Sequence, residues 1–370
     1  MGRRSMSRSS NRTSAPAELG YRMPPEWAPH RATWLAFPHH RTDFPGKLSA
    51  VAWTFAEMAR VLTEGEAVAL LVKDRAEEER ALRMFEDNHV NMARLELVRA
   101  DTNRSWTRDS MPLWVTRGRG KNRDKMAVNF RFDGWSRYRD HQKDDAAGKA
   151  VASRSVKLGH ASAVRAPLLP DGTRAVLEGG SIDVDEFGTL LTTRECLLTS
   201  KRARFGRYGK EVCESILKDE LGVKKILWLG TGIAGDDTSG HVDDFARFAP
   251  GGKVLISKET RKSDPNYEPL VAAHKELLKA TNAAGKKLEV IPLPMPQAVV
   301  YRGDRLPASY ANFYVGNSAV LVPVFNDPND REALGVIAEA FPDRPTVGIY
   351  ARDLVVGLGT LHCSSMQEPL

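Results

Sequence analysis

The C-terminal segment carries the residue best suited to nucleophilic chemistry. Residues 357–364 read GLGTLHCS, so glycines stand close to Cys363. Glycines allow a tight loop that brings the backbone close to a ligand, which makes Cys363 a candidate nucleophile rather than an obvious core residue. Adjacent side chains of an extended segment point to opposite faces. We therefore expect His362 to be structural and the partner base of Cys363 to come from elsewhere.

A histidine and a carboxylate stand two residues apart in GHVDD at 240–244. If this segment is a strand, His241 and Asp243 share one face. A metal site would need further histidine or cysteine ligands at close spacing, and none is present, so we expect no metal. A surface turn remains the alternative interpretation of this segment.

Two further segments add carboxylates that could enter the same site. Trp106, Arg108 and Asp109 fall within four residues, which is typical of a cleft lining or of a buried ion pair. Glu178 precedes two glycines and is either an exposed turn residue or an acid directed into a site. Paired carboxylates suit a planar guanidinium, whose donors form a fixed fork. Burying such a cation without paired anions would be very costly.

A glycine-rich pattern at 230–235, GTGIAG, matches the dinucleotide-binding fingerprint after an apolar run. That site requires a helix to begin at the glycines so that its N-terminus faces the pyrophosphate. Asp236 and Asp237 follow instead, and two carboxylates would repel a pyrophosphate. We therefore predict a loop and no NAD cofactor.

The elements that must position these residues alternate between strands and helices. Short apolar runs predict strands at 32–37, 67–72, 127–130, 190–193, 225–229, 253–256, 288–291, 319–323 and 346–350. Amphipathic stretches predict helices at 51–62, 77–86, 207–221, 270–281 and 330–341. This alternation indicates an α/β fold, and a helix between strand groups recurs at roughly 60–70-residue intervals, which suits a pseudo-symmetric assembly.

Composition excludes several other classes. The 370 residues are 42% hydrophobic and 27% charged, with a net charge of +7, which is ordinary for a globular protein. No apolar run reaches about 18 residues, so no membrane span is expected. Three cysteines without a CxxC pair argue against a disulfide scaffold. The basic clusters at 117–125 and 201–210 look like solvated edges without regular aromatic interleaving, so we expect no nucleic-acid partner.

The chain divides into a short tail and one domain. Residues 1–19 are predicted to be a disordered basic tail, and residues 20–370 a single catalytic domain. The tail holds arginines and serines but lacks the apolar core of a secretory signal. We expect a cytoplasmic protein, and organelle targeting by the tail is the alternative.

Seven motifs together resemble one family. They are MPPEWAPH at 23–30, TWLAFPH at 33–39, WTRD at 106–109, LEGGS at 177–181, DDTSGHVD at 236–243, SYANF at 309–313 and GLGTLHC at 357–363. In this order they resemble the agmatine deiminases, which are grouped with the Porphyromonas-type peptidylarginine deiminases. The resemblance covers nearly the whole chain after the tail.

The resemblance implies a pentein-type α/β propeller, with five pseudo-symmetric ββαβ-like units around a central active site. It implies hydrolysis of agmatine, a small guanidino cation, to N-carbamoylputrescine and ammonia in putrescine and polyamine biosynthesis. The family uses no cofactor, and a homodimer is expected. The alternative substrates are arginine and peptidyl-arginine, and the alternative class is a binding protein that has lost the chemistry.

The family's site residues map onto this sequence. The nucleophile maps to Cys363, the histidine to His241, and the acid that supports the histidine to Glu178. The remaining matches are the guanidinium-binding carboxylates Asp109 and Asp243 and the site tryptophan Trp106.

Some positions depart from the family pattern. Asp237 stands where the family has a glutamate associated with the amine end of the substrate, and Phe44 stands where tryptophan is typical. Leu358, Thr360 and Leu361 replace residues of the usual GGGNIHC ending. The shorter acid at position 237 leaves the tail of the substrate as the open question.

Overall fold

The computed structural model describes residues 14–118 and 120–370. Residues 1–13, which hold the arginines of the predicted tail, lie outside the described residues, as does Arg119. Residues 16–20, partly assigned to that tail, form a turn in which the Ala17 N–H donates to the Asp219 carbonyl (3.0 Å). Among the described helices, none combines the length and apolar character needed to cross a membrane.

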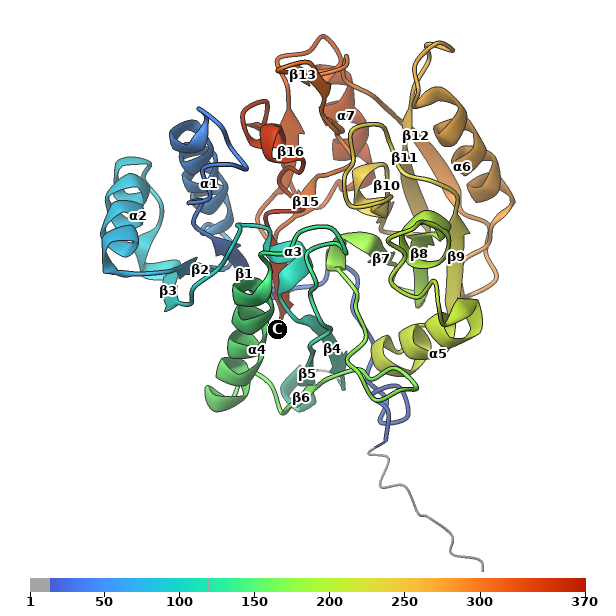
Figure 1. The fold of residues 1–370 in the computed structure, drawn as a ribbon, viewed down its shortest axis with the longest axis horizontal. Helices are drawn as coiled ribbons and strands as arrows, with labels where there is room; N and C mark the ends of the chain where they lie inside the picture. The colour runs from blue at the N-terminus through green and yellow to red at the C-terminus, as the bar shows by residue number, and fades with distance from the viewer. Residues whose placement is uncertain (1–13, 119) are drawn as a thin grey trace, which may run out of the picture.

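Five small sheets surround the centre of the molecule, each with a helix on its outer side (Figure 1). In four of them an antiparallel strand pair is followed by a helix and a third, parallel strand. The first two of these units are β4 (Leu113–Arg117), β5 (Asp124–Val128), α4 (Gln142–Lys157) and β6 (Ala163–Arg165), then β7 (Ile182–Val184), β8 (Thr189–Thr193), α5 (Gly209–Leu221) and β9 (Lys225–Leu229). The next two are β10 (Ala246–Ala249), β11 (Lys253–Lys258), α6 (Tyr267–Lys279) and β12 (Glu289–Pro294), then β15 (Tyr314–Val315), β16 (Val320–Val324), α7 (Asp330–Ala340) and β17 (Thr346–Tyr350).

The fifth unit joins the two ends of the chain. The last strand, β18 (Met366–Pro369), pairs antiparallel with the first, β1 (His30–Ala36), and α1 (Leu48–Leu62) connects β1 to the parallel β2 (Ala67–Val72). This unit is extended by α2 (Arg75–Asp87) and β3 (Leu95–Arg99). The short helix α3 (Thr107–Ser110) and the hairpin β13 (Val300–Tyr301) and β14 (Asp304–Arg305) lie between units. The predicted pentein architecture of five ββαβ units is confirmed.

Local sequence explains most element boundaries. In α1, apolar residues at helical spacing, Val51, Phe55 and Leu62, are fully buried. The Asp74 side chain caps α2 by accepting the Glu77 N–H (2.8 Å). Helix α5 ends at Gly222, whose φ of 65° is a left-handed conformation that favours glycine.

The sequence analysis found the central strands but missed their short partners. Strands β2, β9 and β17 have the predicted bounds, whereas β4, β7, β10, β15 and β18 were not predicted. These edge strands are two to five residues long, so their apolar alternation is too short to read. Helix α4 was also missed, because its sequence, QKDDAAGKAVASRSVK, has a weak apolar stripe.

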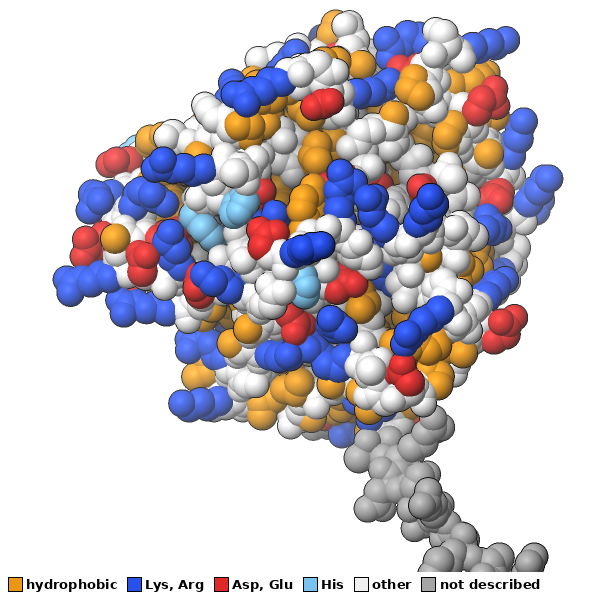
Figure 2. Space-filling view, in the orientation of Figure 1, with side chains coloured by type: hydrophobic (Ala, Val, Ile, Leu, Met, Phe, Trp, Pro, Cys, Tyr) orange, Lys and Arg blue, Asp and Glu red, His pale blue; other side chains and the backbone are white. Residues whose placement is uncertain are grey.

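Basic side chains form no single cluster on the face drawn in Figure 2, where lysines and arginines are scattered among acidic and apolar side chains.

Candidate active site

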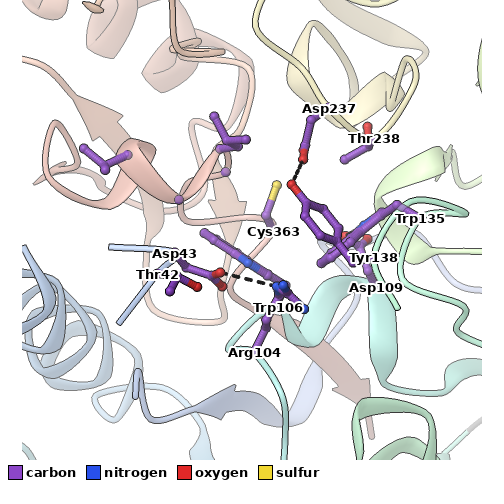
Figure 3. Close-up of a pocket in the computed structure, with 14 residues that line it drawn as sticks. Thr42, Asp43, Arg104, Trp106, Asp109, Trp135, Tyr138, Asp237, Thr238 and Cys363 are labelled. Atoms are coloured by element: carbon purple, nitrogen blue, oxygen red, sulfur yellow. Dashed lines mark hydrogen bonds and ion pairs between the residues drawn. The ribbon is translucent and has the colours of Figure 1, made fainter. Parts of the chain in front are cut away.

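Cys363 lies where the five units meet, on the loop before β18, and lines a cavity of about 180 Å³ (Figure 3). The thiol is 7% exposed. The Asn312 amide donates to Sγ (3.2 Å), and Sγ lies 3.6 Å from Oδ2 of Asp243. Burial, together with the carboxylates of Asp243, Asp244 and Asp109, raises the pKa of the Cys363 thiol well above its usual value.

Asp109 is held by two donors from different units. The Trp135 indole donates to Oδ2 (2.8 Å), and the Gly180 N–H donates to Oδ1 (3.0 Å). Trp135 adopts a left-handed backbone with φ of 59°, a strained conformation that is common at functional sites. Burial, reinforced by the charges of Asp243 and Glu178, raises the pKa of Asp109 to about 6.

Asp243 follows His241 in a 3₁₀ helix, Val242–Asp244, so the predicted strand geometry of this segment is wrong. The Asn312 amide donates to Oδ2 of Asp243 (3.2 Å) and to Oδ1 of Asp244 (3.1 Å). Oδ1 of Asp243 is buried without a hydrogen-bond partner among the described residues. This helical turn, rather than strand alternation, brings the two acids together.

The His241 imidazole is fully buried between carboxylates. Nδ1 lies 3.8 Å from Asp109 and 3.9 Å from Asp243, and Nε2 lies 3.8 Å from Glu178. Within the described part of the chain neither nitrogen has a hydrogen-bond partner. Burial opposes the charged form, but the carboxylates of Asp109 and Glu178 raise the pKa of His241 well above its usual value. The ring therefore carries a proton that it can donate.

Glu178 is paired with an arginine that the sequence analysis assigned to a solvated edge. Arg204 is buried, and its Nε donates to both carboxylate oxygens of Glu178 (2.9 and 3.0 Å). Burial opposes ionisation, but Arg204 and His241 hold the pKa of Glu178 below its usual value. The pairing with Glu178 corrects the interpretation of Arg204 as a surface base.

His362 lies behind Asp243, but residues 361–364 form a turn, so the extended geometry from which its structural role was predicted is wrong. Its Nδ1 faces Asp243 (2.6 Å) and its Nε2 faces Glu26 (2.7 Å). Glu26 also accepts hydrogen bonds from Arg108 and Arg247, both at 2.9 Å. Burial alone would raise the pKa of Glu26, but these cations hold it well below its usual value. This buried network lies under Asp243 and fixes its orientation.

Two more predicted residues, Trp106 and Asp237, also line the cavity. Trp106 is one wall and packs against Phe44 with ring centroids 5.7 Å apart. Asp237 accepts a hydrogen bond from the Tyr138 hydroxyl (2.5 Å), as the dashed line in Figure 3 shows. Burial raises the pKa of Asp237. All seven predicted site residues thus converge on one cavity or directly behind it.

Sequence reasoning missed several supporting residues. Trp135 contacts Asp109 but carried no signal of its own, whereas Gly180 and Asp244 lie within the quoted LEGGS and GHVDD segments without having been assigned a role. Asn312 lies within the quoted SYANF motif, so the motif marked the segment without revealing that its amide contacts the thiol.

Among the described residues, two groups of side chains each bring three metal-binding atoms within 4.8 Å of one another. One group is Glu178, Cys196 and His241, in which the Glu178 carboxylate is already paired with the Arg204 guanidinium. The other is Asp243, Asp244 and Cys363, which belongs to the thiol site itself. Neither group needs a metal to explain its charge, because Arg204 neutralises the first and a cationic substrate would neutralise the second.

Five ββαβ units around a cavity that holds a thiol, an imidazole and buried carboxylates define a pentein hydrolase acting on guanidino C–N bonds. Residues 22–369 match the profile of the family described as Porphyromonas-type peptidyl-arginine deiminase. The chain belongs to this family.

Relatives with known names cover nearly the whole chain. An agmatine deiminase of Stutzerimonas stutzeri is 34% identical over 380 residues, covering 96% of this chain and 98% of the relative. The solved structure of an agmatine deiminase of Enterococcus faecalis is 31% identical, with a TM-score of 0.85 and coverage of 97% and 98%. A substrate-bound agmatine deiminase of C. jejuni is 28% identical, with a TM-score of 0.80 and coverage of 94% and 96%.

Proposed function

We propose that this chain hydrolyses agmatine to N-carbamoylputrescine and ammonia, a step toward putrescine and polyamines, with Cys363 as the nucleophile. The observation that carries the proposal is the cavity lined by Cys363 and Asp109, with Asp243 behind it 3.6 Å from the thiol. Two carboxylates facing a thiol form a complementary site for a flat guanidinium whose carbon lies next to the sulfur. Fixing that geometry contributes several kcal/mol to lowering the barrier.

The bound cation would itself activate the thiol. Carboxylates and burial disfavour the thiolate in the unliganded cavity, and a guanidinium in contact with both acids reverses that electrostatic balance. The thiol proton leaves to solvent as the substrate binds. The thiolate of Cys363 then forms a bond to the guanidinium carbon, which gives a neutral tetrahedral intermediate.

His241 supplies the proton transfers. The protonated imidazole donates to one nitrogen of the intermediate, the C–N bond breaks, and ammonia leaves a cationic thiouronium on Cys363. The neutral imidazole then takes a proton from water, and the resulting hydroxide attacks the thiouronium carbon. Breakage of the C–S bond, with transfer of the hydroxyl proton to the departing sulfur, releases the neutral ureido product and restores the Cys363 thiol.

The substrate tail would extend toward Trp106 and Asp237. We propose that Asp237 takes the amine end of agmatine, because it lines the cavity and bears a carboxylate. Its shorter side chain compared with the family glutamate makes arginine and peptidyl-arginine the alternative substrates. A ureido colour assay on agmatine, arginine and an arginine peptide distinguishes them, and preference for the peptide would overturn the agmatine assignment.

The nucleophile assignment has a direct test. Cys363→Ser removes the thiolate, so we expect no detectable ureido product or ammonia from agmatine, with an unchanged circular dichroism spectrum. Cys213→Ser, a buried cysteine in α5 outside the cavity, serves as the matched control and should retain turnover. Turnover by the Cys363→Ser protein at the wild-type rate contradicts the mechanism.

We also propose a homodimer, as the family resemblance implies, and a cytoplasmic location. Light scattering of the purified full chain measures the assembly, and a mass equal to one chain would overturn it. Fractionation of the source cells measures the compartment, and recovery in an organelle fraction would overturn the cytoplasmic assignment.

A further inference from the structure

Arg204 joins three segments that surround the catalytic histidine. Its side chain has no exposed surface. Nε donates to both oxygens of Glu178, and Nη2 donates to the Thr238 carbonyl (2.9 Å). Its own backbone N–H donates to the Cys196 carbonyl (3.2 Å). Because the guanidinium is planar and rigid, these hydrogen bonds from Nε and Nη2 fix Glu178 and Thr238 relative to each other.

The His241 ring has little else to fix it. The backbone at its N-terminal side is held by hydroxyls, since the Thr238 hydroxyl accepts the His241 N–H (3.2 Å) and the Thr193 hydroxyl donates to the Gly240 carbonyl (2.6 Å). The ring nitrogens themselves make no hydrogen bond within the described residues. The position of the ring therefore depends on the loop that carries it and on Glu178, which lies 3.8 Å from Nε2.

We infer that Arg204 is a positioning residue for the deimination reaction: it holds Glu178 ionised against Nε2 of His241 and fixes the loop at Thr238, so that the imidazole stays protonated and ready to donate. The inference rests on the proposed function. It assigns a role in proton transfer to a side chain that touches neither the cavity nor the thiol.

The charges around the imidazole show why one cation matters. On the Nδ1 side lie Asp109 and Asp243, on the Nε2 side lies Glu178, and the Cys196 thiol is within 4.8 Å of the imidazole and of the Glu178 carboxylate. Asp237 and Asp244 add negative charge from the same loop and the following turn. Without Arg204, the buried Glu178 would lose its cation and take up a proton. His241 would then lose one of the anions that favour its charged form, and its pKa would fall.

The test is the pH dependence of kcat/KM for agmatine in three variants. Arg204→Gln should lower kcat and move the alkaline limb to lower pH by about one unit, because that limb reports the acid of the free enzyme. Arg204→Lys keeps the charge but loses the contact with Thr238, so kcat should fall while the limb stays within about half a unit. Arg165→Gln is the matched control, because Arg165 makes a similar two-point pair with Glu220 (2.8 Å each) outside the cavity.

Other outcomes of these pH profiles would contradict the positioning role of Arg204. A uniform loss of rate in Arg204→Gln, with the limb at its wild-type pH, would make Arg204 a structural residue only and overturn the inference. If Arg204→Gln does not fold, Arg204→Lys and Glu178→Gln decide together: a limb shifted by a full unit in Arg204→Lys, or an unshifted limb in Glu178→Gln, overturns the inference, and an unshifted limb in the first with a limb moved to lower pH by about one unit in the second supports it. Histidine ring NMR follows the titration of His241 in each variant without turnover. The inference is therefore still tested if wild type forms no ureido product and the proposed function itself fails.

Discussion

Buried acidic side chains dominate the chemistry of the cavity. Asp109 and Asp244 both have raised pKa values, because burial disfavours their charge and each lies near other carboxylates. A folded protein gains nothing from such an arrangement when the cavity is empty. The same groups become favourable when a guanidinium binds between them, so the site exchanges stability of the free enzyme for affinity toward a cation.

Replacing Asp109 should reveal this exchange. Its pKa of about 6 exceeds the value of about 3.9 in an unfolded chain. The folded chain therefore binds more protons between those pH values, and its stability falls as pH rises through that window. At pH 8 Asp109→Asn should therefore raise Tm. The free energy of unfolding should increase by at most about 3 kcal/mol, since each pKa unit is worth about 1.4 kcal/mol.

The stability gain from Asp109→Asn should disappear below about pH 4, because Asp109 is then protonated in both the folded and the unfolded wild-type chain. Ureido production should be lost at every pH, because a neutral amide does not pair with a guanidinium. Thermal melts at pH 4, 6 and 8 measure the first effect. A Tm below that of wild type at pH 8 would show that the hydrogen bonds from Trp135 and Gly180 outweigh the buried charge.

Short connecting elements do most of the positioning. The 3₁₀ helix Gly179–Ser181 follows Glu178 directly and places the Gly180 N–H against Asp109. A Cβ on Gly180 would lie 2.6 Å from Nδ1 of His241 and 2.9 Å from Oδ1 of Asp109. Only glycine allows the backbone to approach the imidazole and the carboxylate so closely.

Gly180→Ala should therefore displace His241 or Asp109 and lower kcat/KM by about 100-fold or more, since shifts of about 1 Å at a reacting site have effects of that size. Steady-state kinetics with agmatine measure the loss. Gly230→Ala is the control, because a Cβ there meets no atom within 4 Å, and its activity should be near wild type. Equal activity in the two variants would mean that the residues around Gly180 relax without consequence.

On the scale of the whole molecule, the last strand closes the ring and carries the nucleophile. Cys363 precedes β18 by three residues, and β18 pairs with β1 from the other end of the chain. Glu368 in β18 is fully buried and accepts hydrogen bonds from Arg31 (3.0 Å), Trp34 (2.9 Å) and Lys125 (2.8 Å). Closure of the fold and placement of the thiol therefore depend on the same few residues.

Glu368→Ala should destabilise the protein by about 3–5 kcal/mol, because it leaves the buried Lys125 ammonium without its counter-ion and the Trp34 indole without its acceptor. Urea unfolding of the full chain measures the loss. The control is Glu96→Ala, which removes the other, more exposed partner of Arg31 (2.9 Å) and should cost no more than about 1 kcal/mol. Similar losses in the two variants would argue that the buried cluster contributes little to closure.

Motifs and apolar patterns in the sequence predicted the residue types of the site and the order of the structural units along the chain. The central strands, the nucleophile segment and the acids of the site were visible because each had a local signal: an apolar run, a glycine-flanked cysteine or a carboxylate beside glycines. Arg204 had the opposite signal. It lies among Lys201, Arg202 and Arg207, and a run of bases normally indicates solvent exposure, so only its contact with Glu178 identifies it.

The sequence by itself determined which groups can do the chemistry, because thiol, imidazole and carboxylate are properties of side chains. It also determined that strands and helices alternate, because the apolar periodicity of each element is local. The tertiary structure alone decided the distances among residues 109, 178, 241, 243 and 363. It also decided their protonation, because pKa shifts arise from burial and from charges that meet only after five units and both chain ends have packed together.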